Sequence, residues 1–314
     1  MSSWGPNRDA VLISAAPRPS ILSDKLSVVR RYVKSIRHGM PVSVIALCAG
    51  IFFHIGHSTA QTTPATTMKH VLVISETKGY EHDSIPDAMA NIWKMGHDTK
   101  LWEATLRTDT ELITKKEIKN RNFKNLNYFD ALVFASTTGE LDMDDSQKTD
   151  MMSFIKEDGK GFVGVHAALD TYYKWPEYGE MIGGWFDDHP WTTFDAPIIV
   201  EDPNFPAVRH FPHAFVKRDE IYQPKAWSRD KVNVLLSLDP AKLDLNNPRV
   251  HRKDRDFAVA WSKTYGKGRV FYSTLGHTKE SWDDPDIQKM YFEAVKWTLG
   301  MTEGSTASHA RPQP

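Results

Sequence analysis

The sequence contains only one cysteine, Cys48, among 314 residues. A single cysteine excludes a disulfide within the chain. Cys48 lies inside an apolar run and follows Leu47, where a lipoprotein signal needs a small residue, so lipid attachment at this cysteine is disfavoured. Cleavage after Ala60 would leave the mature protein without any cysteine, and therefore without a thiol nucleophile.

The chain also lacks a strong excess of charge of one sign, because its formal net charge is −1. This value hides an asymmetry: residues 1–60 hold seven Lys or Arg and two Asp or Glu, whereas the remainder holds 32 basic and 38 acidic side chains. A body with more acidic than basic side chains has no general attraction for phosphate backbones. We therefore expect no nucleic-acid partner.

The basic surplus at the start of the chain is typical of an export signal. A basic segment, residues 29–38, precedes an apolar run from Pro41 to Gly56, and the small residues Ser58 to Ala60 follow. The run is too short to span a bilayer comfortably, although a retained anchor is the alternative. The pattern predicts a cleaved leader and signal segment over residues 1–60, a periplasmic or secreted protein, and no stable membrane anchor after cleavage. Met40 is an alternative start that would give a signal of ordinary length.

Strand-like and helix-like segments alternate after a linker at residues 61–69. Short apolar runs at 70–75, 130–135 and 161–166 indicate strands that are buried on both faces. The first is followed by a helix that Ser84 would cap and Gly96 would end, and the second by a helix over residues 144–158. Such alternation predicts an α/β fold of the flavodoxin-like kind, with a mostly parallel sheet and helices on both faces.

The second half of the chain has a different pattern. Residues 193–238 contain short β-rich runs broken by prolines, which predicts a β-rich extension at the edge of the sheet. A hairpin is expected around residues 265–268, and a last helix should begin at Asp284 and Pro285. We expect one domain over residues 70–300 and a disordered tail over residues 301–314.

Three histidines fall in loops that follow predicted strands. His82 comes after the first strand, His166 ends the central strand, and His277 follows the last strand. Ligands of parallel α/β sheets bind beyond the carboxyl ends of the strands, so we expect these side chains to share one cleft. A neutral imidazole can ligate a metal, accept a proton or bind a sugar hydroxyl. Each histidine taken alone could equally orient its loop through a backbone carbonyl.

A fourth candidate, His189, follows two glycines and two aromatic residues in the segment 183–190. The aromatic side chains could be part of the core or could stack on a sugar ring. We therefore take His82, His166, His189 and His277 as candidate catalytic residues. Candidate substrate-binding residues are Asp170, Trp185, Glu220 and Tyr222. A divalent metal could be held by His166, His189 and His277, although their spacing alone is no metal signature.

The segment 164–168, Gly-Val-His-Ala-Ala, resembles the tight turn that presents the nucleophile in hydrolases and in class I glutamine amidotransferases. Here His166 takes the place of the nucleophile. The glutaminase reaction needs a thiolate, so a mature protein without cysteine cannot carry it out.

Several blocks together resemble the ThuA-like, or trehalose utilisation, family. They cover residues 77–85, 161–171, 183–190, 219–222 and 265–277. One departure is Glu81, where the family usually has an arginine. The resemblance implies a class I glutamine amidotransferase-like fold without the amidotransferase thiol. It also implies a role in the use of trehalose and other disaccharides, in pathways that pass through 3-keto sugars.

The resulting expectation is an exported protein that acts on a disaccharide or 3-keto-glycoside through a histidine-lined cleft, with a small carbohydrate as its ligand. His166 and His277 would be acid/base groups or metal ligands, and His82 and His189 would line the same cleft. The alternative is a non-catalytic carbohydrate-binding or accessory protein. Convergence of two or more of these histidines on one point would favour the enzyme.

Overall fold

The computed structural model describes residues 67–119 and 124–312. The expected leader and signal segment, residues 1–60, lies outside the described residues. Within the described ranges, no helix is long and apolar enough to cross a membrane.

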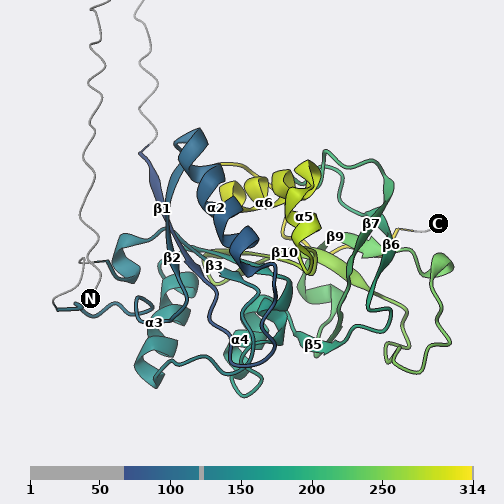
Figure 1. The fold of residues 1–314 in the computed structure, drawn as a ribbon, viewed down its shortest axis with the longest axis horizontal. Coiled ribbons are helices and arrows are strands. Elements are labelled where there is room, and N and C mark those ends of the chain that lie inside the picture. The colour runs from purple at the N-terminus through teal and green to yellow at the C-terminus, as the bar shows by residue number, and fades with distance from the viewer. Residues whose placement is uncertain (1–66, 120–123, 313–314) are drawn as a thin grey trace, which may run out of the picture. The chain divides into compact units, whose positions relative to one another are not determined.

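A single large sheet organises the fold (Figure 1). It has nine strands in the order β2-β1-β3-β4-β11-β10-β9-β6-β7. The parallel half consists of β2 (Trp102–Arg107), β1 (Lys69–Ile74), β3 (Ala131–Ala135), β4 (Gly161–Val165) and β11 (Gly268–Ser273). Because β1, β3 and β4 are parallel neighbours, the predicted α/β sheet is confirmed.

The other half of this sheet is antiparallel and contains the β-rich extension predicted for residues 193–238. Its strands are β10 (Ala258–Tyr265), β9 (Asn233–Leu238), β6 (Thr193–Val200) and β7 (Ala214–Glu220). β10 and β11 form the expected hairpin. A separate two-stranded sheet pairs β5 (Trp185–Asp188) with β8 (Gln223–Lys225).

Helices cover both faces of the parallel half. Val71 and Val73 of β1 pack in one buried cluster with α2 (Ile85–Thr99) and α6 (Pro285–Thr298). Leu72 and Ile74 point to the opposite face and pack with α3 (Asp145–Lys156) and α4 (Pro176–Ile182). Figure 1 shows these two pairs of helices on opposite sides of the sheet, and the short helix α5 (Lys279–Asp283) beside α6. Burial on both faces explains why the strands are continuous apolar runs.

The termini of α2 differ from the sequence prediction. Ser84 occupies the N-cap position, but its hydroxyl donates to the carbonyl of Gly276 and does not cap the helix. Gly96 does not end the helix, which continues to Thr99 and ends at Lys100 in a left-handed conformation. A Cβ at position 96 would lie 2.4 Å from the indole of Trp102. This glycine therefore allows the helix to approach β2 closely.

The segment after α6, for which the sequence predicts a disordered tail, makes defined contacts over its described part. The carbonyl of Ser305 accepts hydrogen bonds from Asn233 and Ser262. His309 Nε2 lies 2.9 Å from the carbonyl of Val234 on β9. These contacts attach residues 305–309 to β9 and β10.

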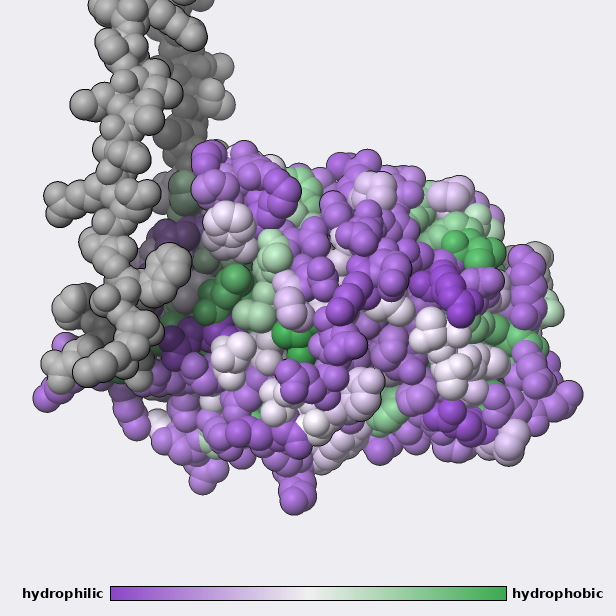
Figure 2. All heavy atoms as spheres, viewed as in Figure 1, coloured by the Kyte–Doolittle hydropathy of each residue, from purple (hydrophilic) through white to green (hydrophobic). Residues whose placement is uncertain are grey.

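The surface of the described residues that faces the viewer in Figure 2 is mostly hydrophilic, and hydrophobic residues are confined to small, separate areas. The two large apolar clusters lie inside the fold, between the sheet and its helices.

Candidate functional site

The site is built around His166, which follows β4 at the carboxyl end of the parallel strands. His166 has a left-handed backbone (φ 45°), and a short 3-10 helix starts at this residue. The side chain is fully buried, and its Nδ1 atom lies 2.6 Å from the carbonyl oxygen of Thr274. The hydroxyl of Tyr272 donates to the backbone carbonyl of His166. β11 and the residue that follows it thus fix both the backbone and the ring of this histidine.

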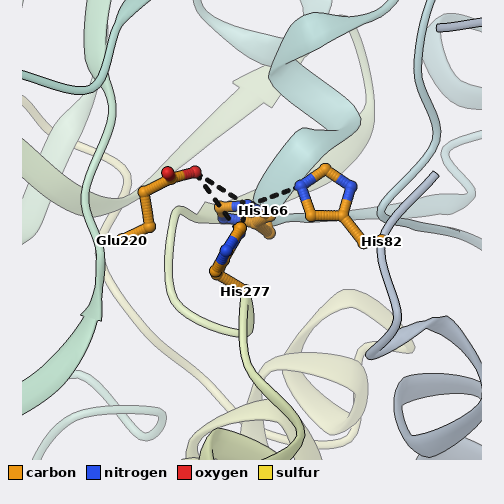
Figure 3. Close-up of side chains that lie close together, drawn as sticks. All are labelled: His82, His166, Glu220 and His277. Atoms are coloured by element: carbon orange, nitrogen blue, oxygen red, sulfur yellow. Dashed lines mark hydrogen bonds and ion pairs between the residues drawn. The ribbon is translucent and has the colours of Figure 1, made fainter. Parts of the chain in front are cut away.

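The other ring nitrogen of His166 is the meeting point of three side chains. Its Nε2 atom lies 3.1 Å from His82 Nε2, 3.1 Å from His277 Nδ1 and 3.0 Å from the hydroxyl oxygen of Tyr222. Figure 3 shows His82 and His277 pointing at His166 from different loops. The structure therefore brings together the histidines that follow β1, β4 and β11.

Glu220 completes this group from the end of β7. Its Oε2 atom lies 3.3 Å from His277 Nδ1 and 3.7 Å from His166 Nε2. We call His82, His166, Glu220 and His277 the His/Glu cluster. One ligand atom from each lies within 4.8 Å of the other three, so the four side chains could hold a single metal ion. The sequence assigned Glu220 to substrate binding and did not include it among the metal candidates.

His189 lies on the outer side of Glu220. Its Nδ1 atom is 3.1 Å from Glu220 Oε1, and its ring stacks on Phe186 with centroids 5.7 Å apart. His189 therefore contacts the His/Glu cluster through the carboxylate and is not one of its four converging members. Tyr222, another candidate, contacts the cluster directly through His166.

Two predicted substrate-binding residues lie outside this group. Asp170 accepts a hydrogen bond from the hydroxyl of Tyr173. The indole of Trp185 donates to the carbonyl of Tyr172 and packs where a side chain at Gly179 would otherwise be. Packing accounts for the position of Trp185, because its polar atom is bonded to the backbone.

Asp219 is a buried residue of the site that the sequence analysis did not single out. Its carboxylate accepts hydrogen bonds from the backbone amides of Gly276 and His277 and from the hydroxyl of Ser281. It therefore holds the loop that carries His277 against the end of β7. The block 219–222 was visible in the sequence, but nothing local indicated that its first acidic residue is fully buried.

Burial sets the charge states of the cluster. Desolvation, followed by the nearby His82 and His277, lowers the pKa of His166 well below its ordinary value. Desolvation and then His277 lower the pKa of His82 to about 4, and desolvation lowers that of His277 as well. These imidazoles are therefore neutral near pH 7. Burial, reinforced by the neighbouring Asp219, raises the pKa of Glu220 to about 7.

The cluster reaches solvent on one side through a pocket of about 300 Å³. His82 and His277 line this pocket together with Tyr80 and Lys279. Tyr80 is 67% exposed and meets the ring of His82 edge-on, with centroids 4.8 Å apart. A small polar ligand can thus approach two members of the cluster beside an exposed aromatic ring.

Comparison with solved structures agrees with this fold. A ThuA-like protein from Bacteroides uniformis aligns with a TM-score of 0.58 and 22% identity, over 74% of this chain and 91% of that protein. A ThuA-like protein from Parabacteroides merdae aligns with a TM-score of 0.55 and 15% identity, over 77% of this chain and 98% of that protein. A search of curated proteins gives no match. The sequence matches the family described as ThuA, trehalose utilisation, over residues 70–298, and the chain therefore belongs to the ThuA family.

Proposed function

We propose that this chain is an exported enzyme of carbohydrate utilisation that acts on a disaccharide or 3-keto-glycoside at the His/Glu cluster. Membership of the ThuA family supports a role in the use of trehalose or related carbohydrates. The export, the sugar class and the chemistry are inferred from the leader sequence, the family association and the geometry of the site.

The observation that carries the proposal is the convergence of His82 and His277 on the Nε2 atom of His166. Burying polar groups costs free energy, and an apolar side chain would fill the same space more favourably. Three histidines from three different loops therefore have no evident packing role at this point. Their place at the carboxyl ends of the parallel strands is where such folds bind ligands.

Access decides which members would touch the sugar. The side chain of His166 is fully buried, whereas those of His277 and Glu220 are 22% and 10% exposed. His277 and His82, which line the pocket, would contact the substrate, with Glu220 beside them, and His166 would position them from behind. His189, whose Nδ1 atom lies 3.1 Å from Glu220 Oε1 and whose side chain is 31% exposed, would connect the carboxylate with solvent for proton transfer.

A screen of the purified full chain tests the proposal. Disaccharides and their 3-oxidised counterparts are incubated with the protein, and products are followed by mass spectrometry. We expect conversion of at least one sugar by the wild type and a fall of about 100-fold or more in His277→Ala, the loss expected when an acid/base group is removed. His97→Ala, which replaces an exposed histidine of α2, is the matched control and should keep full activity.

The outcome also separates the two candidate functions. A sugar that binds the wild type without turnover, and binds less tightly to His277→Ala, would favour the non-catalytic accessory protein. The absence of both turnover and binding for every sugar in the panel would contradict a carbohydrate role for the site.

A further inference from the structure

Hydrogen bonds cannot satisfy all the polar atoms at the centre of the His/Glu cluster at once. The carbonyl of Thr274 can only accept, so the proton of the neutral His166 ring lies on Nδ1 and Nε2 carries a lone pair. Yet His82, His277 and Tyr222 each place a polar atom 3.0–3.1 Å from this nitrogen. One lone pair accepts one well-aligned hydrogen bond, and three neighbours compete for it.

Glu220 adds a further acceptor at the same point. Its Oε2 atom lies 3.7 Å from His166 Nε2 and 3.3 Å from His277 Nδ1. Three imidazole nitrogens and a carboxylate oxygen, pointing at one another in a buried site, form an arrangement that a cation would stabilise.

We propose that His82 Nε2, His166 Nε2, His277 Nδ1 and Glu220 Oε2 bind one divalent transition-metal ion. Tetrahedral coordination with bonds of about 2.0–2.1 Å places neighbouring ligand atoms about 3.3 Å apart. Four of the separations in the cluster are 3.1, 3.1, 3.3 and 3.7 Å. All six separations are within 4.8 Å, so the widest pair must draw together by up to about 1.5 Å for the four side chains to close around an ion.

The ligand types define the class of ion. Imidazole nitrogens with a single carboxylate suit zinc and neighbouring first-row metals, whereas magnesium and calcium prefer oxygen ligands. The surroundings are also those of a metal site, because the carbonyl of Thr274 fixes the tautomer and orientation of the His166 ring. Asp219 holds the backbone of His277 in place by accepting a hydrogen bond from its amide.

A bound ion would supply chemistry for the proposed action on a sugar. This catalytic role of the ion rests on the proposed function. Three neutral imidazoles and one carboxylate neutralise only one charge of a divalent ion. The remaining positive charge would polarise a carbonyl or hydroxyl oxygen of a sugar that enters beside His82 and His277 and expands the coordination to five ligands. No oxidation or reduction of the metal is needed for this role.

Metal analysis of the full chain, purified without chelator, tests the inference directly. We expect about one transition-metal ion per chain, removable by a chelator and restored by Zn²⁺. Co²⁺ added to the stripped protein should give visible absorption bands from nitrogen and oxygen ligands. The dissociation constant for Zn²⁺ should rise at least about 10-fold in Glu220→Gln and in His277→Ala, and stay unchanged in the control His97→Ala.

Both site variants change side chains that are partly accessible to solvent. Circular dichroism must show that the variants are folded before their metal binding is compared with that of the wild type. Stripped wild-type protein that fails to take up Zn²⁺ or Co²⁺ would overturn the inference, as would equal affinity in Glu220→Gln, His277→Ala and His97→Ala. Sugar turnover that persists in metal-free protein would overturn the catalytic role of the ion and leave the proposed function standing. A bound ion without turnover of any sugar would support the metal site and count against the enzyme.

Discussion

The carboxylate of Asp219 accepts a hydrogen bond from the backbone amide of His277, with 3.1 Å between Oδ1 and the nitrogen. The same carboxylate accepts from the amide of Gly276 at 2.8 Å and from the Ser281 hydroxyl at 2.8 Å. One buried side chain of β7 therefore fixes the loop after β11, and with it the position of His277 relative to His166.

Replacing this carboxylate should loosen the loop. In Asp219→Asn an amide N–H faces backbone N–H donors, so at least one donor loses its acceptor. We expect the free energy of unfolding to fall by about 1–3 kcal/mol and the affinity for ligands of the cluster to fall with it, as measured by urea unfolding and Zn²⁺ titration. Ser281→Ala removes one donor and keeps the carboxylate, so it should cost about 1 kcal/mol or less and preserve binding. An Asn variant with wild-type stability and affinity would show that Asp219 does not position His277.

A substitution in α2 separates close packing from helix propensity. Gly96→Ala would gain about 1 kcal/mol from propensity alone. The new Cβ would, however, lie 2.4 Å from the indole of Trp102, so we expect a net loss of about 1–3 kcal/mol in the free energy of unfolding. Ala90→Gly, at an exposed position of the same helix, is the control and should lose about 1 kcal/mol. Thermal or urea unfolding measures both, and a stabilised Gly96→Ala variant would refute the close contact.

The first turn of α6 allows a cap and an ion pair to be measured separately. Asp284 accepts a hydrogen bond from the amide of Asp286, and its other oxygen lies 2.7 Å from Lys217 Nζ. Asp284→Ala loses both interactions and should cost about 1–2 kcal/mol in urea unfolding. Asp284→Asn can keep the cap and loses only the ion pair, so its cost should be below about 1 kcal/mol. Equal losses in the two variants would mean that the cap contributes nothing.

The leader should be removed from the exported protein. Small residues precede Gln61 after the apolar run, so the mature chain should begin near Gln61. N-terminal sequencing of protein from the native host tests this expectation. Recovery of Met1 or Met40 as the first residue would contradict cleavage at this site.

The parallel half of the sheet could be predicted because its signals are local. Continuous apolar runs are buried on both faces in β1, β3 and β4, and the loops after β1, β4 and β11 bring His82, His166 and His277 to one edge. Asp284 and Pro285 mark the start of α6 in the sequence, and the structure places the helix there. Each of these features depends on neighbouring residues or on a general rule of parallel sheets.

The remaining features depend on contacts between distant segments. Glu220 reaches the cluster because residues 219–222 pack on the loop after β11, where the amide of Tyr222 donates to Thr274. No short segment of sequence indicates that the end of the outermost strand, β7, packs against this loop. Gly96 looked like a helix end, because a glycine needed for contact with Trp102 has the same local appearance as one that ends a helix.

A crystal structure of the full chain, grown with the sugar identified by the screen, would test the central claim most directly. We predict a sugar oxygen within hydrogen-bonding or coordination distance of His277 or His82, with Glu220 and His166 converging behind them. A sugar bound at another place, with the His/Glu cluster untouched by it, would contradict the claim that these four residues form the site of its chemistry.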